Sequence, residues 1–80
     1  MTRVSVYYAP DCQLCGPAKA AARAVCDRLA ITLEFVDITD DAALEARYRR
    51  EIPVVEIDGH KAFKYYLDED TLAARLNDRR

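Results

Sequence analysis

The chain has 80 residues, enough for a single domain over residues 1–80 and too few for two. Its 14 acidic residues outnumber its 12 basic ones, giving a formal net charge of −2. The sequence therefore lacks the positive excess that marks nucleic-acid binding. No apolar run approaches the roughly 20 residues needed to cross a bilayer. We expect neither a nucleic acid nor a membrane among its partners.

The N-terminal residues have none of the features of a signal peptide, because Met1, Thr2 and Arg3 lead directly into a strand-like stretch. The expected location is therefore cytoplasmic. Structural disulfides are rare in that reducing compartment. A close pair of cysteines there is more often catalytic or metal-binding.

The first half of the chain predicts a strand, a helix and a second strand. Residues 4–8 alternate β-branched and aromatic side chains with polar ones, and Pro10 ends this strand. Apolar residues then recur at helical spacing from Leu14 to Leu29, through an Ala-rich run of high helix propensity. Residues 32–38 read as the second strand, parallel to the first.

The second half predicts a helix, a hairpin and a last helix. Residues 39–41 offer capping oxygens for a helix that ends at the Arg49–Arg50 charge pair. Residues 54–57 and 60–64 are antiparallel strands joined by an Asp58-Gly59 turn, and Asp68 or Asp70 caps the last helix. The order β-α-β-α-β-β-α predicts an α/β fold: a four-stranded mixed sheet with helices on both faces.

Two cysteines separated by two residues lie between the first strand and the first helix. At a helix start, Cys12 and Cys15 fall on one face and can approach disulfide distance. Unpaired N–H groups and the helix dipole favour a thiolate there. We expect Cys12, at the exposed end, to attack a disulfide. Cys15, one turn further in, would expel the resulting mixed disulfide.

The cysteine pair also leaves other interpretations open. A closed zinc site usually takes four ligands, and the remaining Cys26 and His60 are not plausibly close, so no metal ligand is assigned within one chain. A metal or iron–sulfur cluster shared between two chains remains an alternative, as does a redox-silent interaction domain. Cys26 lies roughly 16 Å beyond Cys15 along a regular helix, so we expect a half-buried, inert thiol.

Two segments carry a family resemblance: Tyr7-Tyr8-Ala9-Pro10-Asp11-Cys12-Gln13-Leu14-Cys15 and Glu51-Ile52-Pro53-Val54-Val55-Glu56-Ile57-Asp58-Gly59. They resemble the short glutaredoxin-like proteins of the thioredoxin fold. The resemblance implies a thiol–disulfide oxidoreductase that reduces protein or small-molecule disulfides without a bound cofactor. It also implies a cis Ile52–Pro53 bond beside Cys12, with the Ile52 N–H and C=O aligning an extended substrate. The implied substrate-binding residues are Tyr8, Pro10, Ile52 and Pro53.

The sequence departs from the family pattern where glutathione would bind. Ala9 stands where glutathione-using members carry a basic residue, and Tyr65 and Tyr66 stand where they carry a glycine pair. We expect one of these tyrosines in the core and the other in solvent. The departures favour an electron donor of the thioredoxin-reductase type over glutathione.

The neighbourhood of the first cysteine also differs from that of thioredoxins. Val6 replaces the buried acid that thioredoxins carry six residues before the motif. Asp11 directly precedes Cys12, and a like charge so close disfavours the thiolate. Gly16 and Pro17 predict a kink or a delayed helix start, since proline cannot donate a helical hydrogen bond.

Overall fold

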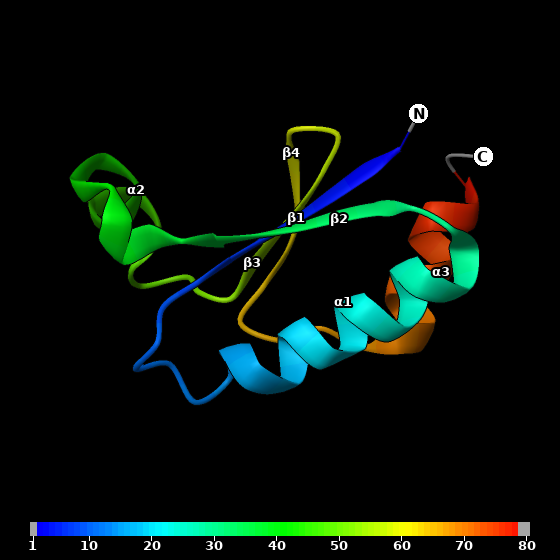
Figure 1. The fold of residues 1–80 in the computed structure, drawn as a ribbon, viewed down its shortest axis with the longest axis horizontal. Coiled ribbons are helices and arrows are strands. Elements are labelled where there is room, and N and C mark those ends of the chain that lie inside the picture. The colour runs from blue at the N-terminus through cyan, green and yellow to red at the C-terminus, as the bar shows by residue number, and fades with distance from the viewer. Residues whose placement is uncertain (1, 79–80) are drawn as a thin grey trace.

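The computed structural model describes residues 2–78 (Figure 1). The elements in chain order are β1 (Arg3–Tyr8), α1 (Cys15–Leu29), β2 (Thr32–Asp37), the 3-10 helix η1 (Ile38–Asp40), α2 (Ala42–Tyr48), β3 (Val54–Ile57), β4 (His60–Lys64) and α3 (Glu69–Asp78). The predicted order of strands and helices is confirmed. The predicted second strand is one residue too long, because the chain turns into η1 at Ile38.

The four strands form one mixed sheet in the order β2-β1-β3-β4. Strands β1 and β2 are parallel, with Arg3 opposite Thr32 and Tyr8 opposite Asp37. Strand β3 runs antiparallel to both β1 and β4, and its pairing with β4 has an irregularity between Val55 and Glu56. The parallel pair places the carboxyl ends of β1 and β2 side by side, and the loop to α1 and η1 both start there.

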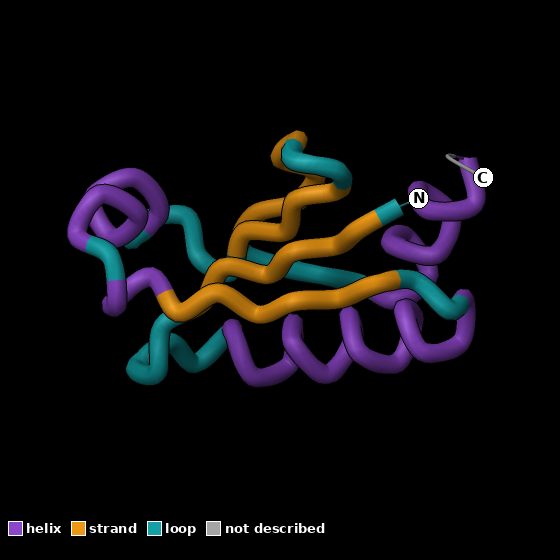
Figure 2. The backbone as a smooth tube through the Cα atoms, turned by 45° about the horizontal axis from the view of Figure 1, so that its top comes forward, coloured by secondary structure: helices purple, strands orange, loops and turns teal. Residues whose placement is uncertain are grey.

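The helices cover the two faces of the sheet unequally. Figure 2 shows α1 and α3 along one face, whereas α2 lies at the end of the sheet where β2 leads into η1. On β1, Val4 and Val6 are fully buried in the cluster that α1 and α3 cover. Tyr7 points to the opposite face, where its ring centroid lies 4.8 Å from that of Tyr48, the last residue of α2. The prediction of helices on both faces is therefore confirmed.

Two clusters of buried side chains hold these layers together. The larger, which we call the main core, joins α1 and α3 to the sheet and consists of Val4, Val6, Ala22, Val25, Cys26, Val55, Ile57, Leu72 and Leu76. The smaller, which we call the site core, lies at the α2 end and consists of Ala9, Cys15, Ile38, Tyr48, Ile52 and Val54. Helix α1 contributes to both clusters, with Cys15 in one and Cys26 in the other.

The hairpin turn and two helix starts follow from local chemistry. Asp58 and Gly59 both have positive φ, at 53° and 84°, as a two-residue type I′ turn requires. The Asp41 carboxylate accepts from the Ala43 N–H at 2.9 Å and so caps α2. The Asp68 carboxylate accepts from the Thr71 N–H at 3.0 Å and caps α3.

Helix α1 begins later than its cysteine spacing suggests. Its first residue is Cys15, so Cys12 lies in the preceding turn instead of on the helix. Pro17 therefore falls in the first turn, where backbone N–H groups have no partner within the helix and a missing donor costs nothing. The expectation of a delayed helix start is confirmed, and the placement of both cysteines on one helical face is wrong.

Candidate active site

The two cysteines of the motif meet where β1 gives way to α1. The turn is closed by the Cys12 N–H, which donates to the Ala9 carbonyl at 3.1 Å. Cys12 is partly exposed, whereas Cys15 is only 2% exposed. Both are free thiols. Their unequal exposure agrees with the expectation that Cys12 lies outermost and Cys15 one turn further in.

The two thiols also differ in electrostatic environment. Burial raises the pKa of Cys15 to about 12, and its side-chain hydrogen bond with Cys12 acts in the same direction. A backbone hydrogen bond with Ala9 and the charge of Lys19 act in the opposite direction and are smaller than the effect of burial. Cys15 is therefore a protonated thiol near neutral pH. It contacts the more exposed Cys12 from beneath.

The site core gathers most of the residues that the sequence assigned to the site. Cys15 and Ile52 are buried in it, and Tyr8 and Cys12 pack against it from the surface. Pro53, the neighbour of Ile52, is fully buried, and the Ile52–Pro53 bond is cis, as expected.

Pro10 is the exception among these residues. Its side chain is exposed on the turn that precedes Cys12. Neither apolar cluster includes it.

The backbone of Ile52 differs from the expectation in one respect. Its N–H donates to the Tyr48 carbonyl at 3.0 Å, at the end of α2. That N–H is thus satisfied within the chain, and its predicted availability to a substrate strand is wrong. The Ile52 carbonyl has no hydrogen-bond partner among residues 2–78.

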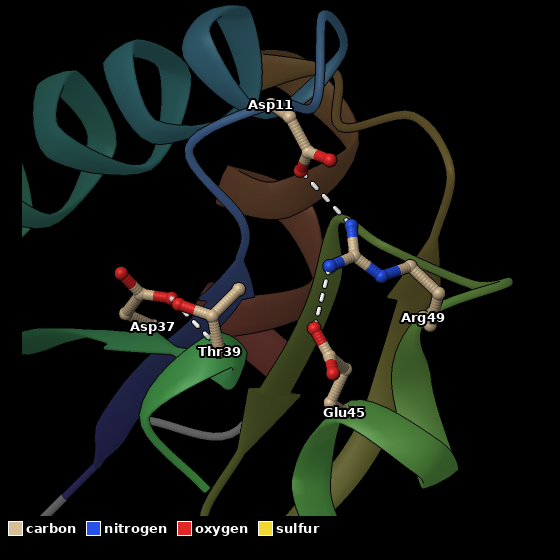
Figure 3. Close-up of polar contacts among 5 residues, drawn as sticks. All are labelled: Asp11, Asp37, Thr39, Glu45 and Arg49. Carbon is tan, nitrogen blue, oxygen red and sulfur yellow. Dashed lines mark hydrogen bonds and ion pairs between the residues drawn. The ribbon is translucent and has the colours of Figure 1, made fainter. Parts of the chain in front are cut away.

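Arg49 connects the cysteine turn to α2. Its guanidinium donates to the Asp11 carboxylate at 2.9 Å and to that of Glu45 at 2.6 Å (Figure 3). The hydrogen bond and then the charge of Arg49 lower the pKa of Asp11. Arg49 stands at the end of α2, as expected, and the fold also brings that end of the helix to the turn before Cys12.

Lys19 is a neighbour of the site that the sequence analysis did not identify. Its Nζ lies 3.9 Å from the ring centroid of Tyr8 and 5.1 Å from that of Phe35. It stands four residues after Cys15 on α1, one turn further along the same face. That i,i+4 spacing is the signal in the sequence that would have singled it out.

The tyrosine pair after β4 is exposed. The side chains of Tyr65 and Tyr66 are 41% and 74% exposed, so the expectation that one enters the core is wrong. Tyr65 has φ +72°, a left-handed conformation, and its N–H donates to the carbonyls of Glu51 and Pro53. These hydrogen bonds place the Tyr65 backbone beside the loop that contains Pro53, twelve residues earlier in the chain.

A polar cluster of Tyr7, Tyr48 and Glu56 adjoins the site core. The hydroxyl groups of Tyr7 and Tyr48 both donate to the Glu56 carboxylate, at 3.1 and 2.7 Å. Burial, followed by the hydrogen bond with Glu56, raises the pKa of Tyr48 to about 12. Because these side chains come from β1, α2 and β3, the cluster fixes α2 against the sheet.

The third cysteine is separate from the site. Cys26 is 1% exposed within the main core, and burial raises its pKa. It is therefore more deeply buried than the half-buried thiol expected.

Over residues 2–78, no three Cys, His, Asp or Glu side chains come together as metal ligands. No helix within that range is long and apolar enough to cross a membrane.

A partly exposed cysteine before a helix, a buried cysteine at its first residue and a proline loop beside them, on this sheet, define a protein of the thioredoxin-like fold. Residues 3–77 match the glutaredoxin-like domain family (DUF836). The chain belongs to that family, and the resemblance seen in its sequence is confirmed.

Solved structures agree with this placement. The protein XcR50 from X. campestris is 31% identical over 94% of this chain and 96% of its own, with a TM-score of 0.77. The protein Ne2328 from Nitrosomonas europaea is 25% identical over 92% and 89%, with a TM-score of 0.74. A thioredoxin from Halobacterium salinarum, 20% identical over 96% and 73%, shares the fold with a TM-score of 0.75. A comparison with curated proteins finds no significant match.

Proposed function

We propose that this protein is a thiol–disulfide oxidoreductase that uses Cys12 and Cys15 to reduce disulfides. The observation that carries the proposal is the asymmetry of the two contacting thiols. Cys12 is partly exposed at the entrance to a helix, and Cys15 is buried beneath it as a protonated thiol. Such a pair has one sulfur that a substrate can reach and one that it cannot.

The asymmetry divides the reaction into two exchanges. The Cys12 thiolate attacks one sulfur of a substrate disulfide, forms a mixed disulfide and releases the first substrate thiolate, which takes up a proton. Cys15 then loses its proton and attacks the Cys12 sulfur. This forms the Cys12–Cys15 disulfide and releases the second substrate thiolate, which is protonated in turn. The substrate gains two electrons, and the protein dithiol is oxidised.

The surroundings favour a protein disulfide as substrate. Ile52 belongs to the buried cluster against which Cys12 packs, and its carbonyl, without a partner among residues 2–78, can accept from an extended segment. Tyr8 is partly exposed next to the same cluster, and Pro10 is exposed on the cysteine turn. We assign these groups and the Pro53 loop to the contact with substrate.

The electron donor in this proposal is a flavoenzyme of the thioredoxin-reductase type. Glutathione carries two carboxylates and an amine, so its recognition requires cations and close backbone donors. Ala9 is 2% exposed and uncharged, and the Arg49 guanidinium already binds two carboxylates. Tyr65 and Tyr66 present side chains where a glycine pair would admit the ligand.

Insulin reduction coupled to NADPH and thioredoxin reductase tests the proposal. We expect turnover with the wild type and only background with Cys12→Ser. Background rates for both proteins would contradict a disulfide reductase. A visible absorption spectrum of freshly purified protein tests the cluster-binding alternative, since a bound iron–sulfur cluster absorbs there and a dithiol does not.

A further inference from the structure

Lys19 is the charged side chain nearest in sequence to the buried thiol on its own helix. It follows Cys15 by one turn of α1, and the two residues face the same side of the helix. Cys15 is the first residue of that helix and is 2% exposed. A cation therefore lies one turn away, on the same side of the helix as a sulfur that water barely reaches, and its charge acts on that thiol. Charges near a buried group are screened less than charges at the surface.

Aromatic rings hold this cation in place. The Lys19 Nζ lies 3.9 Å from the Tyr8 ring centroid, and 5.1 Å from that of Phe35 on β2. The two rings meet edge to face, with centroids 6.5 Å apart. Contacts between a cation and ring faces at these distances are attractive. The Lys19 side chain is therefore anchored between helix and sheet instead of extending freely into solvent.

We propose that Lys19 is a positioning residue for the second exchange: its fixed positive charge favours the thiolate of Cys15 as that sulfur attacks the Cys12–substrate disulfide. This inference rests on the proposed dithiol function. In the step concerned, the Cys15–H bond gives its proton to solvent and the Cys12–Cys15 bond forms. The bond between Cys12 and the substrate sulfur breaks, and the substrate thiolate leaves with the electron pair.

The other groups around Cys15 do not supply this charge. Cys12 is itself part of the disulfide at that stage, and Ala9 contributes a backbone hydrogen bond. Val6 is fully buried and apolar, so this position of β1 offers no acid to accept the proton. The hydroxyl group of Tyr48, from α2, is bonded to Glu56. Burial remains the largest influence on the pKa of Cys15, and Lys19 is the positive charge that opposes it.

Besides Cys15, the groups of residues 2–78 that interact with Lys19 are two rings and one acid. Tyr8 and Phe35 are neutral, and Asp37 lies at the end of β2, where the charge of Lys19 acts on it. The Asp37 carboxylate already accepts from the Thr39 N–H at 2.9 Å and the Thr39 hydroxyl at 2.6 Å (Figure 3). Its negative charge is thus stabilised locally, and no ion pair to Asp37 holds the lysine away from the thiol.

Stopped-flow mixing with the neutral reagent 4,4′-dithiodipyridine separates the two exchanges. Each exchange releases one thiopyridone, the first after attack by Cys12 and the second after attack by Cys15. A neutral reagent carries no charge of its own to interact with the lysine. The second phase is followed from about pH 6 to pH 10.

The expected result is a slower second phase in Lys19→Met with little change in the first. A rise of one unit in the pKa of the attacking thiol reduces the fraction present as thiolate about tenfold. The thiolate of the more basic thiol is a better nucleophile, which restores part of the rate. The net effect is about threefold to fourfold per unit near neutral pH. The pH profile of the second phase should move to higher pH. Lys19→Arg should retain the wild-type profile because it keeps the cation.

Arg23→Met is the matched control. Arg23 stands one turn beyond Lys19, and its guanidinium carbon lies 5.3 Å from the Phe35 ring centroid. Arg23→Met removes a cation from the same part of α1, next to the same Phe35 ring but one turn further from Cys15. The rate of the second phase should therefore not change. If loss of packing between α1 and Phe35 were the cause, the second phase would be slower in both Lys19→Met and Arg23→Met.

Three outcomes would overturn the inference: an unchanged second phase in Lys19→Met, equal slowing of both phases, or equal slowing in Lys19→Arg. The wild-type trace decides separately on the proposed function. A wild type without any second phase would contradict dithiol chemistry as a whole. A normal wild-type trace that Lys19→Met leaves unchanged would contradict only the role of the lysine.

Discussion

The guanidinium of Arg49 lies 2.9 Å from the carboxylate of Asp11, the residue that directly precedes Cys12. The same guanidinium lies 2.6 Å from Glu45, one turn back on α2. The negative charge that the sequence places beside the reactive cysteine is therefore paired with a positive one. The pair also ties the cysteine turn to a helix that is otherwise distant in sequence.

This pairing predicts an effect of Arg49 on the reactivity of Cys12. In Arg49→Met, Asp11 is left as an unpaired negative neighbour and disfavours the thiolate. We expect iodoacetamide to alkylate Cys12 about twofold to threefold more slowly at pH 7, in a Cys15→Ser background and at low salt. The effect is small because the pair is exposed and screened.

The double variant Asp11→Asn/Arg49→Met provides the control for that measurement. It removes both charges and should return the alkylation rate to the wild-type value. Asp11→Asn alone should raise the rate by a similar factor, because it removes the negative neighbour and leaves the Arg49 cation in place. A rate in Arg49→Met equal to that of the wild type would mean that the pair does not act on the thiol.

The assignment of the two cysteines predicts different trapping behaviour. Cys15→Ser retains the outer thiol and loses the one that resolves the mixed disulfide, so a covalent adduct with substrate should accumulate. Cys12→Ser should trap nothing. Intact-mass measurement after mixing with oxidised insulin distinguishes them, and Cys26, present in both, should stay unmodified. Adducts on Cys12→Ser instead would reverse the assignment.

Weak use of glutathione is a third prediction. Loss of one charge-assisted contact costs about 1.5–3 kcal/mol, or roughly one to two orders of magnitude in affinity. Turnover with glutathione and glutathione reductase should therefore be at least tenfold below turnover with thioredoxin reductase. Efficient turnover with the glutathione system alone would exclude this interpretation.

A variant pair examines the physical basis of that preference. Tyr65→Gly/Tyr66→Gly removes both rings and gives position 65, where φ is +72°, a residue that adopts this conformation readily. Glutathione turnover should rise severalfold in this variant. Tyr65→Phe/Tyr66→Phe, which keeps both rings, should behave like the wild type.

The hydroxyl group of Tyr48 predicts a dependence of stability on alkaline pH. Its pKa is raised from 10.0 to about 12 in the folded protein by burial and Glu56, so the unfolded chain releases this proton first. The stabilisation is fully present below pH 10 and is lost as pH rises through about 12. Tyr48→Phe should reduce this part of the dependence.

Urea unfolding measured at pH 8 and at pH 11 tests the effect. Tyr48→Phe should lower the free energy of unfolding at pH 8 by about 1 kcal/mol, because one donor to Glu56 is lost. The difference in the free energy of unfolding between Tyr48→Phe and the wild type should be smaller at pH 11. Tyr66→Phe, at a residue 74% exposed, should change neither value. If Tyr48→Phe lowered the free energy of unfolding equally at both pH values, ionisation of the Tyr48 hydroxyl would not contribute to the pH dependence of stability.

Local patterns in the sequence predicted the elements well. Alternation in β1, the Ala-rich run of α1 and the Asp58-Gly59 turn each depend on residues close in the chain, and all three were predicted correctly. The order of exposure of the two cysteines was also predicted correctly, although Cys12 lies in the turn before α1 and not on the helix.

Contacts between distant segments were not predictable in the same way. The approach of Arg49 to Asp11 depends on where α2 ends relative to the turn before Cys12. Long-range contacts, such as the packing of Tyr48 on Tyr7, determine that position. The Ile52 N–H was assigned to a substrate because nothing local in the sequence shows the carbonyl that accepts from it.

The division of the interior into two clusters has a consequence for how such a protein can evolve. The main core unites the sheet with α1 and α3, whereas the thiols and their neighbours belong to the site core around α2. Mutations that alter the surroundings of Cys12 therefore fall largely outside the side chains that hold the scaffold together. Selection can change the residues around Cys12 to suit a new partner while the main core keeps the domain stable. Helix α1 contributes to both clusters, so its residues must serve both the site and the stability of the domain.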